Sequence, residues 1–270
     1  MLTMPKYLSE RQLHDYQTDG CIFPLTIMSV EGARHHRSRL ETAEAEHGGM
    51  HYLVKPYLVL SSTAEIGRDP ILLDAVEDIL GPDILMWDSA YVIKEPHDSR
   101  YVSWHQDLMY WGLNSDRLVT AWVALTKTNP QNGCMKFIPG SHNDGKIEHR
   151  DTYAADNILH RGQELAVAID ETEAVDIVLE PGQVSLHHGW VFHASNPNPS
   201  NDRRIGLTFQ YVSPSVRQMF STNESATLVR GVDDYGHFQP EPHCENDFTP
   251  EGVEFQKKVQ ALKHAVFDRA

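Results

Sequence analysis

The chain has 270 residues, of which 40% are hydrophobic and 23% charged, and this ordinary globular composition excludes disordered, collagen-like and coiled-coil proteins. A formal net charge of −15 disfavours a nucleic-acid partner, because such partners require a basic surface. No segment approaches the roughly 20 apolar residues of a membrane helix, and residues 1–7 lack the apolar core of a secretory signal. We therefore expect a globular protein with neither a membrane nor a nucleic-acid partner.

The cysteines predict a reducing compartment. Cys21, Cys134 and Cys244 are widely spaced, odd in number and outside any CxxC pair. This pattern favours free thiols in a cytoplasmic protein over a disulfide framework. No repeat or flexible linker divides the chain, so we expect a single domain over residues 1–270, as a monomer or homodimer.

The first part of the chain, to about residue 82, is predicted to be helical. Ser9 is a candidate N-cap, and Gly20 and Gly81 follow apolar periodic segments as terminators. The predicted helices are residues 9–20, 29–48 and 70–80. A last helix is predicted over Pro250–Phe267, in a C-terminal part that begins near residue 214.

From residue 83 to about 213 the pattern changes to short β-rich segments separated by turn dipeptides such as Asn132-Gly133 and Pro181-Gly182. The predicted strands are residues 84–93, 101–105, 118–125, 135–138, 174–179, 183–186 and 204–212. Helices followed by strands predict the α+β class, an antiparallel barrel or sandwich with helices on one face.

A possible metal site begins at the end of one predicted strand, in Trp104-His105-Gln106-Asp107. Because residues i and i+2 of a strand share a face, His105 and Asp107 should project together and Gln106 away from them. They would supply two ligands of a 2-His-1-carboxylate triad, which holds Fe(II) and leaves positions open. The HxD spacing alone also occurs by chance, as a surface polar pair.

The third ligand must come from a distant strand. Candidates downstream are His142, His149, His160, His187, His188, His193, His237 and His243. His193 is favoured because it follows a Pro-Gly turn and a strand, and because Ser195 shares its face. His187 and His188 are adjacent, so at most one faces inward, and we expect them to pack or hydrogen-bond nearby.

The strand 204–212 predicts an unusual polar wall. Its apolar face is Ile205, Leu207, Phe209 and Tyr211, and its other face is Arg204, Gly206, Thr208 and Gln210. An arginine inside a barrel requires an anionic partner, since an unpaired buried charge is very costly. That partner is either the carboxylate of a small molecule or an acidic side chain of the protein.

Together these segments resemble the phytanoyl-CoA dioxygenase family of Fe(II)- and 2-oxoglutarate-dependent oxygenases, in order and spacing over about residues 85–212. The matching segments are Trp104–Leu108, Thr120–Leu125, Asn132–Met135, Ile138–His142, Pro181–Gln183, His193–Pro197 and Arg203-Arg204. The resemblance implies a double-stranded β-helix, also described as a jelly-roll or cupin-like barrel.

In this family the distal histidine ligand is followed two residues later by a hydroxyl residue and eleven residues later by an arginine. The resemblance thus implies that His105, Asp107 and His193 hold Fe(II), and that Arg204 and Ser195 bind the far carboxylate of 2-oxoglutarate. It also implies that Trp122 walls the cosubstrate pocket. Relatives that halogenate have a small residue in place of the carboxylate, so Asp107 indicates a hydroxylase.

The implied reaction hydroxylates a C–H bond while 2-oxoglutarate and O2 become succinate and CO2. Tyr91, Tyr110 and Trp111 are candidates for substrate contact, although aromatic residues at strand spacing more often belong to a core. The alternatives are a cupin-like isomerase, a metal-binding barrel without catalysis and a structural interaction protein. A protein that does not use 2-oxoglutarate has no reason to place Arg204 at this spacing.

The substrate is the least determined feature. The family accepts acyl-CoA thioesters, amino-acid derivatives, phosphonates and natural products. The net charge of −15 and the lack of a basic cluster favour a small free metabolite over acyl-CoA. Residues 227–238 are expected either to fold over the barrel mouth as a lid or to form a surface loop.

Overall fold

The computed structural model of the protein describes residues 4–267, with side chains described as far as Lys263. The described chain contains five α-helices and five short 3-10 turns. The helices are α1 Glu10–Asp19, α2 Val30–His47, α3 Ser61–Gly67, α4 Pro70–Leu80 and α5 Pro250–Phe267. The 3-10 turns are η1 Pro56–Leu58, η2 Asp107–Met109, η3 Pro130–Asn132, η4 Ser141–Asp144 and η5 Glu171–Glu173. The four predicted helices are confirmed, and α3 was not predicted.

Local capping explains where α1 begins and ends. The Ser9 hydroxyl accepts a hydrogen bond from the backbone N–H of Gln12, whose side chain accepts one from the backbone of Ser9. Gly20 ends the helix with a left-handed φ of 78°, a conformation that glycine adopts without a steric penalty. The amphipathic pattern and these two caps together make this helix predictable from sequence.

The β-structure forms two main sheets and a small hairpin. The major sheet has the strand order β1-β9-β4-β11-β2-β12-β13, the minor sheet has the order β3-β10-β5-β8, and β6 pairs with β7. The strands of the major sheet are β1 Cys21–Thr26, β9 Gln183–His187, β4 Leu118–Ala124, β11 Arg204–Val212, β2 Ile84–Lys94, β12 Ser225–Arg230 and β13 Gln239–Pro240. The others are β3 Val102–His105, β10 His193–Ser195, β5 Met135–Phe137, β8 Val175–Asp176, β6 His149–Asp151 and β7 Gln163–Leu165.

One correction concerns the N-terminal part, which is not entirely helical. Residues 21–26 form β1, an edge strand of the major sheet that pairs antiparallel with β9. Short strands of this kind are stabilised by the neighbouring strand, which lies about 160 residues away along the chain, so local periodicity does not reveal them. The strands β6, β7, β12 and β13 were also not predicted.

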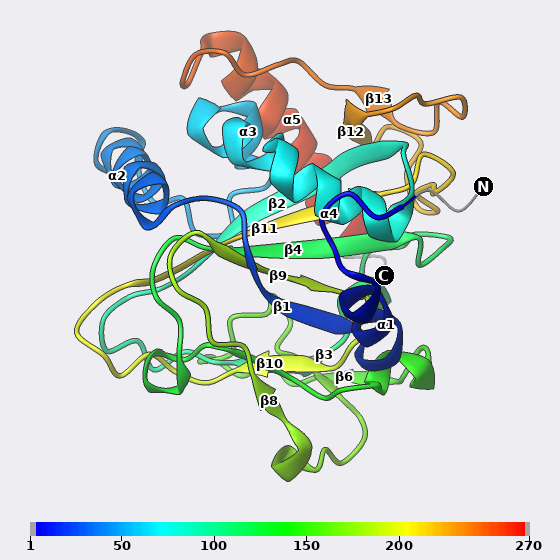
Figure 1. The fold of residues 1–270 in the computed structure, drawn as a ribbon. Coiled ribbons are helices and arrows are strands. Elements are labelled where there is room, and N and C mark those ends of the chain that lie inside the picture. The colour runs from blue at the N-terminus through cyan, green and yellow to red at the C-terminus, as the bar shows by residue number, and fades with distance from the viewer. Residues whose placement is uncertain (1–3, 268–270) are drawn as a thin grey trace.

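Helices α3, α4 and α5 and the minor sheet lie on opposite faces of the major sheet. Figure 1 shows α3, α4 and α5 over one face of the major sheet, with β3 and β10 beneath the other. On β11, one set of alternate residues is completely buried in the core with α4: Ile205, Leu207, Phe209 and Tyr211. The expected α+β class, with helices on one face of antiparallel β-structure, is confirmed.

Three further expectations can be compared with the structure. Cys21, Cys134 and Cys244 are all free and buried. Across residues 4–267, none of the helices combines the length and apolar character required to cross a bilayer. Residues 227–230 belong to β12 at the side of the major sheet, and no residue of 227–238 lines the main cavity, which gives the lid interpretation no support.

Candidate metal and cosubstrate site

Strand pairing brings the two predicted histidine ligands together. In the minor sheet β10 runs antiparallel to β3, and His193 lies directly opposite His105. Asp107 does not continue the strand as the i, i+2 argument assumed, but opens the 3-10 turn η2. This turn still directs its carboxylate to the two rings: Asp107 Oδ1 lies 3.4 Å from His105 Nε2 and 3.7 Å from His193 Nε2.

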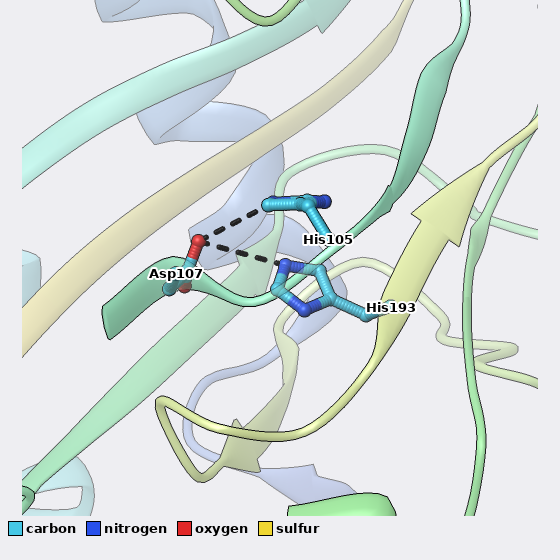
Figure 2. A group of neighbouring side chains, drawn as sticks. All are labelled: His105, Asp107 and His193. Atoms are coloured by element: carbon cyan, nitrogen blue, oxygen red, sulfur yellow. Dashed lines mark ion pairs between the residues drawn. The ribbon is translucent and has the colours of Figure 1, made fainter. Parts of the chain in front are cut away.

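The backbone fixes the orientation of both imidazole rings. His105 Nδ1 lies 2.9 Å from the carbonyl oxygen of Ser103, and His193 Nδ1 lies 3.0 Å from that of Val191. A carbonyl only accepts, so each Nδ1 carries the proton and each Nε2 keeps a free lone pair directed at Asp107. Figure 2 shows the three side chains converging in this way.

The charge states suit a divalent cation. Burial and the neighbouring His105 lower the pKa of His193 to about 3, so its ring is neutral at pH 7. Burial alone would raise the pKa of Asp107, but attraction to His193 and His105 in their protonated forms outweighs this and holds the pKa well below its usual range, so the carboxylate is ionised at pH 7. Metal ligands must be deprotonated, and one ligand atom from each of the three residues lies within 4.8 Å of the others.

Gln106 is turned away from the site, as predicted, and holds the surrounding loops. Its side-chain amide donates hydrogen bonds of 2.6 Å to the carbonyl of Gly145 and 2.8 Å to that of Trp190. Its oxygen accepts one of 2.9 Å from the backbone N–H of Ile147. The residue between the two ligands therefore fixes the direction in which they point.

The adjacent residues His187 and His188 face different environments. His187 is 2% exposed, and its Nε2 lies 3.6 Å from Asp107 Oδ2. His188 points elsewhere, with Nδ1 accepting from the backbone N–H of Trp190 and Nε2 3.9 Å from Asp116. The expectation of nearby packing holds for both, but His187 is closer to the metal ligands than sequence reasoning indicated.

Arg204 lies inside the molecule without an acidic partner. It is 1% exposed, and its Nε and Nη2 atoms have no hydrogen-bond partner within the described structure. Burial lowers its pKa to about 10, so it remains charged at pH 7. A fully buried guanidinium with unused donors fits an anionic ligand that can accept two hydrogen bonds.

The indole of Trp122 covers Arg204 on one side. The guanidinium carbon lies 5.3 Å from the ring centroid, within the range of a cation–π contact. The ring approaches β11 so closely that a Cβ atom at Gly206 would lie 1.9 Å from it. Glycine at position 206 therefore gives Trp122 the space to lie flat over the inner face of β11.

Arg203 faces the other way, as the strand alternation predicts. Its guanidinium lies 2.8 Å from Glu44 and 2.8 Å from Glu95, and it is part of an outer charged cluster. It therefore has carboxylate partners of its own, whereas Arg204 has none among the described residues.

Lys94 is a residue that the sequence reasoning did not identify. It is completely buried opposite Arg204 on the neighbouring strand β2. Its Nζ donates a hydrogen bond of 2.7 Å to Ser195 Oγ and others to the carbonyls of Ser195 and Asn196. Burial and the charge of Arg204 lower the pKa of Lys94 to about 6. The three donated hydrogen bonds require the ammonium form of Lys94, and with that form Ser195 keeps its own hydroxyl proton available for a ligand.

The predicted metal and cosubstrate residues line one cavity of about 370 Å³ between the two main sheets. Its wall includes all three triad residues together with Arg204, Ser195, Trp122, Tyr110, Trp111, Tyr52 and His187. Tyr52, whose backbone φ is 54°, was not predicted to line the cavity, because nothing in the local sequence pattern indicated this position.

Tyr91 requires a correction, because it does not line the cavity. Its side chain is fully buried in the core on the opposite face of β2, and its hydroxyl lies 2.7 Å from Thr63 Oγ1. The cavity is lined instead by its neighbours Ala90 and Val92, in agreement with strand alternation.

Two comparisons by sequence agree on the relationship of this chain. A family model described as Phytanoyl-CoA dioxygenase (PhyH) matches residues 31–206. A probable alpha-ketoglutarate-dependent hypophosphite dioxygenase of Stutzerimonas stutzeri is 29% identical over 160 residues, covering 58% of this chain and 55% of that protein. Human peroxisomal phytanoyl-CoA dioxygenase is 28% identical over 149 residues, covering 53% and 44%. The chain thus spans about half the length of the curated relatives it matches.

Solved structures extend the likeness to nearly the whole chain. The apo structure of ThoJ, a non-heme monooxygenase, is 32% identical, has a TM-score of 0.84, and is matched over 96% of this chain and 98% of that one. CytC3 with Fe(II) and alpha-ketoglutarate, at 22% identity and a TM-score of 0.68 over 90% and 97%, shares the fold. Because the family model covers well over half of the residues, the chain belongs to the phytanoyl-CoA dioxygenase family.

Proposed function

We propose that this protein is an Fe(II)- and 2-oxoglutarate-dependent dioxygenase that hydroxylates a C–H bond of a small metabolite. The observation that carries the proposal is the presence in one cavity of the His-Asp-His cluster and the unpartnered guanidinium of Arg204. A metal-binding barrel without 2-oxoglutarate would account for the first feature and leave the buried charge unexplained.

His105, Asp107 and His193 would hold the iron. Two neutral imidazole nitrogens and one carboxylate oxygen form the donor set typical of non-heme Fe(II) oxygenases, which leaves positions for other ligands. The backbone carbonyls that accept from the Nδ1 protons keep both rings in place.

Arg204 and Ser195 would bind the far carboxylate of 2-oxoglutarate. The guanidinium offers two unused donors, and the Ser195 hydroxyl, held by Lys94, offers a third. Trp122 shields this end of the cavity, where low polarity strengthens the charge-assisted contact.

When bound together, Fe(II) and 2-oxoglutarate supply the oxidising power, with O2 consumed and succinate and CO2 released. The protein contributes the orientation of the ligands and the exclusion of bulk water from the cavity. Tyr110 and Trp111 line it and are proposed to contact the substrate. The substrates printed for the relatives differ, from hypophosphite to phytanoyl-CoA, and support no particular choice here.

The proposal is tested by anaerobic iron binding and by succinate formation from 2-oxoglutarate. The wild-type protein should bind one Fe(II) per chain, and His105→Ala, Asp107→Ala and His193→Ala should each lose both iron and turnover. His188→Ala is the matched control, since this neighbouring histidine points away from the triad and should retain iron. Full activity in a triad variant, or loss of iron in His188→Ala alone, would contradict the assignment.

A further inference from the structure

A row of four polar side chains crosses the cavity wall. In the major sheet Asp88 of β2 lies opposite Gln210 of β11, Gln210 lies opposite Thr120 of β4, and Thr120 lies opposite His187 of β9. All four line the cavity. We name these residues the polar row. Neighbouring strands are about 4.8 Å apart, so the polar row extends over about 14 Å.

The polar row starts at the metal ligands. His187 Nε2 lies 3.6 Å from Asp107 Oδ2, and the ring centroids of His187 and His193 are 5.1 Å apart. The other three residues continue across the sheet from this point. A molecule that lies along the row would therefore have one end beside the metal site.

Two members of the row hold unused hydrogen-bonding atoms. His187 Nδ1, His187 Nε2 and Thr120 Oγ1 are buried and have no hydrogen-bond partner in the described structure. Native proteins rarely leave such atoms unpaired, because their desolvation is not compensated. Because His187 Nε2 faces Asp107, the atoms left for a bound molecule are His187 Nδ1 and Thr120 Oγ1.

The row is separate from the cosubstrate end of the cavity. Gln210 is six residues beyond Arg204 on the same face of β11, which corresponds to about 20 Å of strand. A five-carbon dicarboxylate held by Arg204 and the metal ligands leaves Gln210 and Asp88 uncovered. The carboxylate of Asp88 is paired with Lys263 at 2.9 Å, so its negative charge is already compensated within the protein.

We infer that the polar row binds the substrate, and that this substrate is a small metabolite with uncharged hydrogen-bonding groups, such as hydroxyl, amide or ring nitrogen, next to the oxidised carbon. The inference rests on the proposed function and specifies its substrate class. An unbranched acyl chain would leave the buried polar atoms of His187 and Thr120 unpaired, which disfavours fatty acids and their thioesters.

The test uses near-isosteric variants at the part of the row that does not contact the metal ligands. Thr120→Val and Gln210→Leu remove hydrogen-bonding groups with little change of volume. Thr208→Val is the matched control, because Thr208 lines the same cavity but its hydroxyl already donates to the carbonyl of Ala90. Iron content and thermal unfolding establish that each variant is folded.

The probes form two panels, and succinate formation above the substrate-free rate is measured for each probe. The polar panel contains free amino acids, their N-acetyl amides, ribonucleosides and polyols. The apolar panel contains straight-chain fatty acids and their CoA thioesters. We expect at least one polar probe to raise succinate formation tenfold or more.

For that probe, Thr120→Val and Gln210→Leu should each raise the half-saturating concentration about 3- to 10-fold, the effect of one lost hydrogen bond. The half-saturating concentration of 2-oxoglutarate should stay within about 2-fold, and Thr208→Val should change neither constant.

Three results would overturn the inference: stimulation by the apolar panel only, stimulation by no polar probe, or a polar probe that is indifferent to both variants. A control measures the slow conversion of 2-oxoglutarate without substrate, which the wild type should show and Asp107→Ala should not. This control separates failure of the inference from failure of the proposed function. If that conversion is observed, the enzyme class stands and the substrate class alone is wrong.

Discussion

At the scale of single residues, two adjacent arginines experience opposite surroundings. Arg203 has Glu41, Glu44 and Glu95 within 4 Å, whereas Arg204 is buried without a carboxylate. Alternation along β11 is sufficient to produce this difference, because successive side chains point to opposite faces of a sheet.

The two arginines therefore predict a clear contrast in the use of 2-oxoglutarate. Losing one partner of a buried charge-assisted pair costs about 2–5 kcal/mol, so Arg204→Ala should raise the apparent constant for 2-oxoglutarate about 30-fold or more. Arg204→Lys should recover only part of this loss, because an ammonium lacks the planar fork of a guanidinium. Steady-state kinetics at varied 2-oxoglutarate concentration measure both effects.

Arg203→Ala is the control and should leave this constant nearly unchanged, although it removes several outer ion pairs. The reverse result would mean that the cosubstrate approaches from the outer face of β11. If neither variant changed the constant, the use of 2-oxoglutarate itself would be in doubt.

Residue-scale prediction from sequence succeeded where a periodic pattern exists and failed where contacts are distant. Arg204 was placed correctly relative to Arg203 by alternation. The same rule applied to strand 84–93 would have placed Tyr91 on the face opposite Ala90, away from the cavity. Lys94 was missed because its partner Ser195 is about 100 residues away along the chain.

At the scale of elements, a buried ion pair connects the C-terminal segment to the start of η1. Lys55 Nζ lies 2.6 Å from Glu241 Oε1, and both side chains are completely buried. The other oxygen of Glu241 accepts from the hydroxyls of Tyr57 at 2.8 Å and Thr227 at 2.7 Å. Glu241 directly follows β13. Its carboxylate therefore connects this part of the chain to Thr227 in β12 and to Lys55 and Tyr57, which precede β2.

Removing this carboxylate should destabilise the fold strongly. Glu241→Gln leaves the Lys55 ammonium buried without a full counter-charge, and breaking such a pair typically costs about 3–5 kcal/mol. Urea unfolding would measure the loss. Glu180→Gln is the matched control: its partner Lys127 is 56% exposed and Glu180 itself 52%, so the free energy of unfolding should change by less than about 1 kcal/mol.

A double variant, Lys55→Met with Glu241→Leu, should recover part of the stability, because it removes both charges together. Equal losses in Glu241→Gln and Glu180→Gln would contradict the structural role given to the buried pair.

Elements were predictable when their signals were local. Helix α1 has a capping box and a C-cap glycine, and α4 has an apolar stripe and terminator, so both boundaries follow from sequence. Strand β1 has neither signal, and its structure depends on pairing with β9. The position of Asp107 in a 3-10 turn was missed for a related reason, since strand periodicity does not show where a strand ends.

At the scale of the whole molecule, three histidines outside the metal site hold backbone amides. His51 Nδ1 accepts from the N–H of Ile93, His149 Nε2 from that of Gln106, and His188 Nδ1 from that of Trp190. A protonated ring nitrogen cannot accept a hydrogen bond, so protonation would break all three contacts, of which those of His51 and His149 join distant parts of the chain.

These contacts predict a loss of stability in mild acid. Burial lowers the pKa of His51, His149 and His188 to about 4 each, while an unfolded histidine titrates near 6.5. Between these values the unfolded chain binds more protons than the folded one, so stability falls as the pH falls. Each group contributes up to about 1.4 kcal/mol per pH unit, so these three rings alone predict a decrease of about 4 kcal/mol from pH 7.5 to 5.5, and the lowered pKa of His193 adds to it in the metal-free protein.

Urea unfolding of the metal-free protein at several pH values tests this prediction, because carboxylates titrate mainly below the chosen window. His51→Asn retains an acceptor near the Nδ1 position but cannot be protonated, so it should reduce the loss of stability between pH 7.5 and 5.5 by about 1.4 kcal/mol. A free energy of unfolding that changed by less than about 1 kcal/mol between pH 7.5 and 5.5 would show that these histidines are not the neutral acceptors inferred here.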